Sequence, residues 1–171
     1  MHQGNHCEIE RKYLIAMPDA DFLRARPDCA VWEIEQIYLR SEPGVTRRIR
    51  RVAEQGETRY YRTEKRRLSA LSSDEREAQI DAREYASLRR EADPALKPIE
   101  KTRLRIPFEG QVLEIDLYPF WQDRAILEIE LAREDEPAHI PEWLRVAREV
   151  TDDKRYRNVR LAASVPQDAL D

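Results

Sequence analysis

The sequence has little of what marks membrane-spanning, exported or cysteine-stabilised proteins. Its 171 residues include two cysteines, three histidines and four glycines. No apolar run reaches the roughly 18 residues that a membrane-spanning helix needs, and the first residues contain none that could act as an export signal. Cys7 and Cys29 give no disulfide framework, so we expect free thiols in one cytoplasmic domain over residues 1–171.

Histidine and cysteine are also too scarce to predict a site of their own. His2, His6 and Cys7 form a local group at the N-terminus, where incidental imidazoles are the better interpretation. His139 falls in a loop flanked by Pro137 and Pro141, where a solvated surface position is expected. Neither a histidine-based metal site nor a histidine-activated nucleophile is therefore predicted.

Charge of both signs is abundant. Lys and Arg number 30, Asp and Glu number 34, and the formal net charge is −4 with a pI near 5.6. Nucleic-acid-binding proteins usually show a basic balance and a concentrated basic face. We therefore expect a small-molecule ligand as the partner, with neither nucleic acid nor membrane.

Alternation of polar and apolar residues, or a run of β-forming residues, predicts eight strands. They occupy residues 8–15, 31–39, 45–52, 58–66, 75–81, 99–108, 112–118 and 126–132. Short connections with glycine at 54–57 and 109–111 are typical of hairpins, so neighbouring strands should be antiparallel. Helices are predicted at 82–91, with Asp81 as N-cap, and at 141–148 and 155–164, while residues 68–74 should form a mobile loop. The fold class is α+β.

The predicted strands carry charge at every second position, and therefore on one face. Acidic pairs at this period are Glu8 and Glu10, Glu75 and Glu77, Glu114 and Asp116, and Glu128 and Glu130. Other strands carry bases at the same period: Arg48 and Arg50, Lys65 after Thr63, and Lys101, Arg103 and Arg105. Acidic and basic strands thus share a common charged face.

An antiparallel sheet with one solvated face would show the same alternation, and Glu33 and Glu35 illustrate it beside the apolar Trp32 and Ile34. Segregation of acids and bases onto different strands favours a different structure, a sheet closed into a barrel with its charged face inward. Such a lumen must be wet, because unpaired buried charges cost several kcal/mol each. A polyphosphate fits it, since bases bind phosphate oxygens and carboxylates recruit Mg²⁺ or Mn²⁺.

The motifs also resemble a known family. Glu8-Ile9-Glu10-Arg11-Lys12 is similar to the E-x-E-x-K signature of the CYTH family, the triphosphate tunnel metalloenzymes, which include class IV adenylate cyclases and thiamine triphosphatases. Later blocks resemble the family's in the right order: Arg48-Ile49-Arg50, Thr63-Glu64-Lys65, Glu75-Arg76-Glu77, Glu100-Lys101-Thr102-Arg103, Glu114-Ile115-Asp116, Glu128-Ile129-Glu130 and residues 150–158. The chain is most similar to compact bacterial members that hydrolyse inorganic tripolyphosphate.

This resemblance implies a closed eight-stranded antiparallel tunnel with a few flanking helices, two divalent ions, and roles by position. Glu8 and Glu128 match the ligands of one metal, and Glu10, Glu77 and Glu130 those of a second that positions water, with Asp116 as a further metal-ligand candidate. Lys101, with Tyr38, matches the plug of one tunnel end and is also a catalytic candidate. The phosphate-binding bases are matched by Lys12, Arg48, Arg50, Lys65, Arg103 and Lys154.

Several alternatives stay open on the sequence. Ser73 stands where related sequences often have an arginine, and Arg66 and Arg67 add bases nearby, so substrate choice is not settled. The same tunnel could cyclise ATP to cAMP, or hydrolyse thiamine or nucleoside triphosphates if Trp32, Trp121 or Trp143 formed an aromatic platform. It could also be a noncatalytic polyphosphate-binding module. The family resemblance further allows a homodimer.

Overall fold

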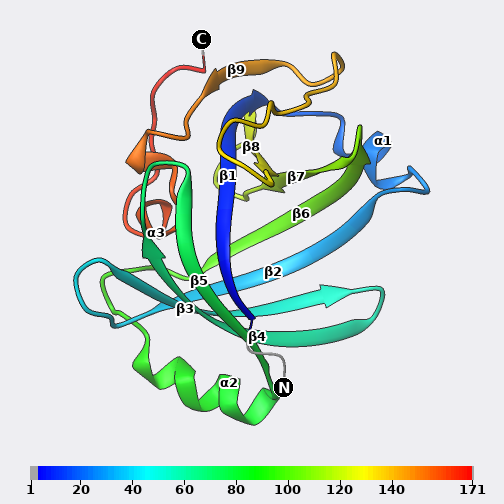
Figure 1. Ribbon diagram of the computed structural model, residues 1–171. Helices are drawn as coiled ribbons and strands as arrows, with labels where there is room; N and C mark the ends of the chain where they lie inside the picture. Colours follow the sequence, from blue (N-terminus) through cyan, green and yellow to red (C-terminus); the bar gives the residue numbers. More distant parts are fainter. Residues whose placement is uncertain (1–3, 171) are drawn as a thin grey trace.

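The strands close into a barrel in the computed structural model, which describes residues 4–170 (Figure 1). The barrel strands are β1 (Gly4–Ala16), β2 (Ala30–Leu39), β3 (Val45–Glu54), β4 (Glu57–Arg67), β5 (Ser72–Ile80), β6 (Ile99–Phe108), β7 (Gln111–Leu117) and β8 (Arg124–Glu130). Their hydrogen-bonded order is β5-β4-β3-β2-β6-β7-β8-β1, and a further β1–β5 pairing closes the ring. The predicted eight-stranded antiparallel barrel is confirmed.

Strand β1 closes the barrel because it is long enough, at 13 residues, to pair with two different strands along its length. Its first part pairs with β5 from Gly4 to Ile9, and its second part pairs with β8 from Glu10 to Ala16. A ninth strand, β9 (Val146–Glu149), pairs with the same second part near Tyr13. β1 therefore carries Glu8 and Glu10 across the seam where the two ends of the sheet meet.

Two of the hairpins use the predicted short turns. Gln55 and Gly56 join β3 to β4, and Glu109 and Gly110 join β6 to β7. All four residues have positive φ, from 46° to 80°, which matches the right-handed twist of the flanking strands. Glycine at the second turn position adopts this conformation without the Cβ clash that other residues meet.

The apolar core lies largely outside the barrel. On one side, Leu113, Ile115, Leu127 and Ile129 point away from the lumen, and the segment from Leu131 to Leu144 covers them together with α1 (Ala20–Arg24). On the other side, Tyr85 of α2 (Ala82–Leu88) packs on a smaller cluster of β2, β3 and β5 residues, namely Ile37, Leu39, Ile49 and Ile80. Because these clusters supply the apolar burial, the inner face is left for charge.

A third cluster sits on the inward side and involves the C-terminal turns. Tyr156 in η2 (Lys154–Tyr156) and Leu161 in α3 (Asn158–Leu161) pack with Leu14 and Ile126, which share the charged face of β1 and β8. These apolar residues occupy the barrel beyond Lys12. The C-terminal segment thereby forms one boundary of the lumen.

Some local predictions differ from the structure. Helix 141–148 is wrong: the segment forms turns and then β9, because it extends along the free edge of β1. Helix 155–164 is broken into η2 and α3 by an extended Arg157. The predicted loop at 68–74 is shorter, since β5 begins at Ser72, and the short α1 was not foreseen. His2 lies outside the described residues.

Helix 82–91 is confirmed as α2 followed by the 3₁₀ turn η1 (Arg89–Glu91), and Asp81 caps it as predicted. The Asp81 side chain accepts a hydrogen bond of 2.8 Å from the Glu84 backbone N–H. We expect Asp81→Ala to lower the free energy of unfolding by about 1 kcal/mol. Urea denaturation measures this, with Ser87→Ala in the same helix as a control, and an unchanged midpoint would contradict the capping role.

Within the described residues, none of the helices has the length and apolar character needed to cross a membrane.

Candidate functional site

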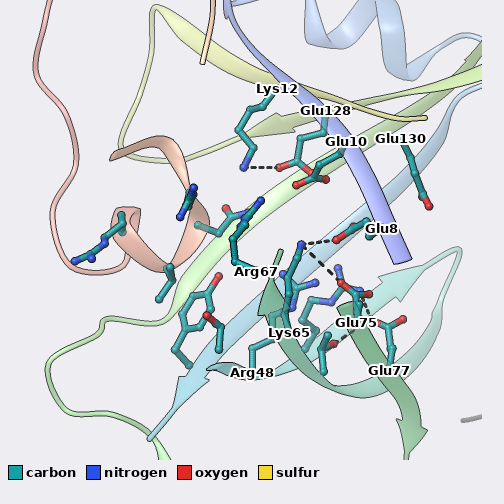
Figure 2. A pocket seen from close by; sticks show the side chains of 18 of the residues that line it. Glu8, Glu10, Lys12, Arg48, Lys65, Arg67, Glu75, Glu77, Glu128 and Glu130 are labelled. Atoms are coloured by element: carbon teal, nitrogen blue, oxygen red, sulfur yellow. Dashed lines mark hydrogen bonds and ion pairs between the residues drawn. The ribbon is translucent and has the colours of Figure 1, made fainter. Parts of the chain in front are cut away.

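The inward faces of the strands enclose a charged cavity of about 470 Å³. Figure 2 shows its acidic and basic side chains pointing toward one another from opposite walls. The charged residues that line it are Glu8, Glu10, Lys12, Arg48, Arg50, Lys65, Arg67, Glu75, Glu77, Arg103, Glu114, Glu128, Glu130, Arg157 and Arg160. The charged face of the strands thus points into the barrel, as predicted.

One acidic group combines neighbouring positions of β1 and β8. Glu128 is buried and forms ion pairs with Lys12 (3.2 Å) and Arg103 (3.0 Å). Although burial opposes it, these cations hold the pKa of Glu128 well below its usual range. Glu10 lies beside it, and burial together with the Glu128 charge raises the pKa of Glu10 to about 7. The pKa values of two adjacent carboxylates in one lumen are thus shifted in opposite directions.

A second acidic group lies lower in the view of Figure 2, around Lys65. The Lys65 ammonium forms an ion pair with Glu8 and lies 3.7 Å from Glu75. Although burial opposes it, Lys65 lowers the pKa of Glu8 to about 2, whereas burial and Glu8 raise the pKa of Glu75. The carboxylates of β1 and β5 therefore share one cation across the barrel seam.

The predicted trio of Glu10, Glu77 and Glu130 is not gathered at one point. Glu77 accepts hydrogen bonds from Arg50 and Thr63, each 3.0 Å long. Glu130 pairs with Glu10 across β1 and β8, but its side chain is 52% exposed, lies 2.7 Å from His6 Nε2 and points away from the Glu10 carboxylate in Figure 2. His6 therefore has a defined partner at the rim of the lumen, which the N-terminal position of this histidine did not indicate.

Asp116 is not placed as a metal ligand. It is fully buried outside the cavity lining, and its oxygens accept hydrogen bonds from Lys101 (2.7 Å) and from Arg103 (2.7 and 2.9 Å). With its lone pairs used in this way, Asp116 orients Arg103, which reaches on to Glu114 and Glu128. The acid is a structural counterion.

The two plug residues differ in position. Tyr38 is buried, lines the cavity and accepts a hydrogen bond of 2.6 Å from Gln36. Lys101 is also buried, but it is bonded to Asp116, lies 5.8 Å from the Tyr118 ring centroid and does not line the cavity. Burial lowers the pKa of Lys101 to about 8 even though Asp116 opposes the shift. This geometry does not support a direct contact between Lys101 and a substrate in the cavity.

Lys154 does not reach the lumen. It is exposed at the start of η2 and is absent from the cavity lining, whereas Arg157, three residues later, lines it. The reason is local: Arg157 has ψ of 138°, so the chain turns between η2 and α3 instead of continuing as one helix. On this segment Arg157 lines the lumen and Lys154 does not, so a phosphate-binding role for Lys154 stays a prediction.

The donor chemistry of the lumen fits a hard divalent cation. Glu8 Oε2, Glu75 Oε2 and Glu128 Oε1 are buried, and none of them accepts a hydrogen bond. Each forms an ion pair with the ammonium group of a lysine, Lys12 for Glu128 and Lys65 for the other two. Over residues 4–170, no three acidic, histidine or cysteine side chains already converge as an ion site. Cation binding would therefore need Lys65 or Lys12 to move toward another anion.

Sequence reasoning left several lining residues without a role. Glu75 has the same period-two spacing as Glu77, which was the available signal for it. Arg67 stands at the end of a strand, where alternation from Lys65 would have placed it inward. Arg157 and Arg160 had no such signal, because their direction depends on the break between η2 and α3.

Comparisons with known proteins support one relationship over nearly the whole chain, although no family model matches it. The inorganic triphosphatase of Nitrosomonas europaea is 35% identical over 166 residues, covering 93% of this chain and 99% of the relative. The crystal structure of the inorganic triphosphatase NE1496 superposes with a TM-score of 0.56 at 30% identity, covering 93% and 96% of the two chains. The PH1819 protein of Pyrococcus horikoshii OT3, at 23% identity over 75% of this chain and 80% of its own, shares the fold with a TM-score of 0.57.

Proposed function

The chain belongs to the CYTH family of triphosphate tunnel metalloenzymes, and on that premise we propose that it hydrolyses inorganic tripolyphosphate to pyrophosphate and phosphate in the lumen. The Nitrosomonas relative, named an inorganic triphosphatase, aligns over almost all of the chain. One observation carries the proposal: bases and carboxylates line the same cavity from different strands. Such walls suit a linear polyanion that is accompanied by cations.

The bases bind the substrate in this proposal. Lys12, Arg103, Lys65 and Arg50 are each paired with a lumen carboxylate, so an entering phosphate chain would exchange these partners rather than meet bare charges. Arg48 contacts Gln36 at 3.4 Å and is ready to bind a phosphate oxygen. Guanidinium groups pair with phosphate oxygens through two parallel hydrogen bonds, which fixes the position of the chain.

The carboxylates would hold Mg²⁺ or Mn²⁺. We propose Glu10 and Glu128 for one ion and Glu8 and Glu75 for another, because these pairs have buried oxygens or a burial-raised pKa. Glu77 and Glu130 are proposed to complete the acidic wall. A bound divalent ion would supply charge neutralisation for the transferred phosphoryl group and the departing pyrophosphate. The protein's own part is to position the chain and to orient water, without a covalent intermediate.

An organic triphosphate is the weaker candidate. Trp32 lines the lumen, but the Arg105 guanidinium lies 4.4 Å from its ring centroid and covers that face. Trp121 is buried in the cluster around Tyr156, and Trp143 is on the surface near Arg26. An open aromatic platform for adenine or thiamine is therefore not offered by these three residues.

The test is phosphate release from tripolyphosphate, ATP and thiamine triphosphate with Mg²⁺ or Mn²⁺ and with a chelator, while cAMP is assayed in the ATP reaction. We expect tripolyphosphate to be preferred by at least about tenfold in kcat/KM, with activity lost on chelation. Accumulation of cAMP would replace the proposal with a cyclase. Absence of turnover on every substrate would favour the noncatalytic polyphosphate-binding module.

We also propose a cytoplasmic location, since Cys7 and Cys29 are free thiols.

A further inference from the structure

The chain after α3, residues 162–170, passes beside the end of β9 (Figure 1). Arginines from three elements contact it at one residue, Asp168. Arg148 of β9 donates a hydrogen bond of 2.7 Å to the carboxylate, and Arg155 of η2 lies 3.5 Å from the same oxygen. Arg124 of β8 donates a bond of 2.7 Å to the Asp168 backbone oxygen. These four residues do not line the lumen, so the cluster is separate from the site described above.

Tyr156 connects this cluster to the lumen. Its side chain is fully buried, and its hydroxyl donates to the Asp168 carboxylate, at 3.2 and 3.3 Å from the two oxygens. The same hydroxyl accepts a bond of 2.9 Å from Arg148. The backbone oxygen of Tyr156 accepts a bond of 3.4 Å from Lys12 Nζ, and Lys12 lines the lumen beside Glu128. One residue therefore binds Asp168 through its side chain and a lumen base through its main chain.

The position of the Lys12 ammonium depends on where η2 lies. A lysine side chain is a flexible stem with a rotating head group, so its acceptors determine where the charge sits. η2 is a single 3₁₀ turn of three residues, and Tyr156 is its buried residue. A turn this short is held mainly by contacts outside itself. The bond from the Tyr156 hydroxyl to Asp168 therefore helps to fix the Tyr156 carbonyl that Lys12 binds.

We propose that Asp168 is a positioning residue, which acts through Tyr156 to set where the Lys12 ammonium lies in the lumen. Its effect on turnover rests on the proposed function and deepens it. Without the Asp168 carboxylate, η2 loses an anchor, and a shifted Tyr156 carbonyl leaves Lys12 to follow Glu128 alone. A binding group that moves by about 1 Å holds its substrate less well.

The first measurement needs no substrate. It follows the Cε signal of Lys12 by NMR in the full chain labelled with ¹³C-lysine, with the signal identified by its loss in Lys12→Arg. Asp168→Ala and Tyr156→Phe are each expected to shift this signal. Asp123→Ala is the matched control, because Asp123 pairs with Arg124 of the same cluster but forms no hydrogen bond with Tyr156 in residues 4–170. It is expected to leave the signal in place.

The second measurement is tripolyphosphate hydrolysis with Mg²⁺. Asp168→Ala and Tyr156→Phe are each expected to raise KM by about fivefold and to lower kcat by less than about twofold, since they weaken the placement of a binding group. The double variant is expected to raise KM no further than either single variant, because both remove the same link. Asp123→Ala should keep the KM of the parent.

A merely structural role for Asp168 gives a different result. A lower Tm in Asp168→Ala, with the Lys12 signal and KM of the parent, would overturn the positioning role. Additive effects on KM in the double variant would overturn the route through Tyr156, and a shifted signal with the parent's KM would overturn the effect on substrate. If Asp168→Ala does not fold, Tyr156→Phe decides, because it keeps the ring and removes only the hydroxyl.

Failure of the proposed function is distinguishable from failure of the positioning role. If the parent releases no phosphate from tripolyphosphate, the hydrolase proposal fails, while the Lys12 signal still decides whether Asp168 sets the position of that base. If the parent hydrolyses tripolyphosphate and neither variant changes the Lys12 signal or KM, the positioning role alone is overturned.

Discussion

Asp116→Ala is expected to lower the free energy of unfolding by about 3–5 kcal/mol, because it leaves buried cations without their counterion. Asp116 is 0% exposed and Lys101 is 3% exposed, so bulk solvent does not compensate for the lost carboxylate in an intact fold. Arg103 keeps Glu114 and Glu128 as partners, whereas Lys101 has Asp116 as its one ion-pair partner in the described chain. Chemical denaturation at neutral pH measures the loss.

Lys101 supplies the controls for this prediction. Burial already lowers the pKa of Lys101 to about 8, and without Asp116 it should fall further, so Lys101 can become neutral. The stability deficit of Asp116→Ala should therefore be smaller at pH 9 than at pH 7. A double-mutant cycle with Lys101→Met should show a coupling energy above about 1 kcal/mol, and additive effects would contradict the pairing. Asp135→Ala, at an exposed surface pair, should leave stability unchanged.

The barrel could be predicted because alternation is a strong signal when it is repeated on eight strands. Charged residues on one face and mainly Leu and Ile on the other specify the register and the inner face of β7 and β8. β9 could not be predicted in this way: it has four residues, and it is a strand because the β1 edge beside Tyr13 is free to pair. Tertiary pairing decided that segment, whereas its own pattern suggested a helix.

The candidate site was predictable as a set of inward residues and less so as a set of partners. Glu114 and Asp116 have the same spacing as the other acidic pairs, yet Glu114 lines the cavity and Asp116 is buried behind it. Sequence spacing places both on one face but does not say how far along the barrel the solvent reaches. Arg157, and not the predicted Lys154, lines the cavity for a similar reason: one extended residue between two short helical turns changes which side chain points inward.

Substitution of Glu10 by glutamine is expected to separate activity from stability. We expect Glu10→Gln to lower kcat/KM for tripolyphosphate by at least about 100-fold, as loss of a carboxylate that holds a divalent ion would do. Glu33→Gln is the control, because Glu33 has the same spacing to Glu35 but faces outward, bonded to Thr102. Parental activity in Glu10→Gln would remove Glu10 from the proposed metal-binding set.

In the presence of a chelator, Glu10→Gln should raise the stability of the protein at pH 8, although it lowers the activity. The folded pKa of Glu10 is about 7 against 4.5 for the free side chain, so ionisation opposes folding, and its cost grows as pH rises from about 4.5 to 7. Glutamine removes this cost, so Glu10→Gln should melt higher than the parent at pH 8 and close to it at pH 4.5. Glu8 has a folded pKa of about 2, and Glu8→Gln should melt lower at pH 8 because its ion pair with Lys65 is lost. Substitutions of two acids that are two residues apart on the same face of β1 would then shift Tm in opposite directions. An equal loss of stability in both variants would show that burial and Glu128 do not raise the pKa of Glu10.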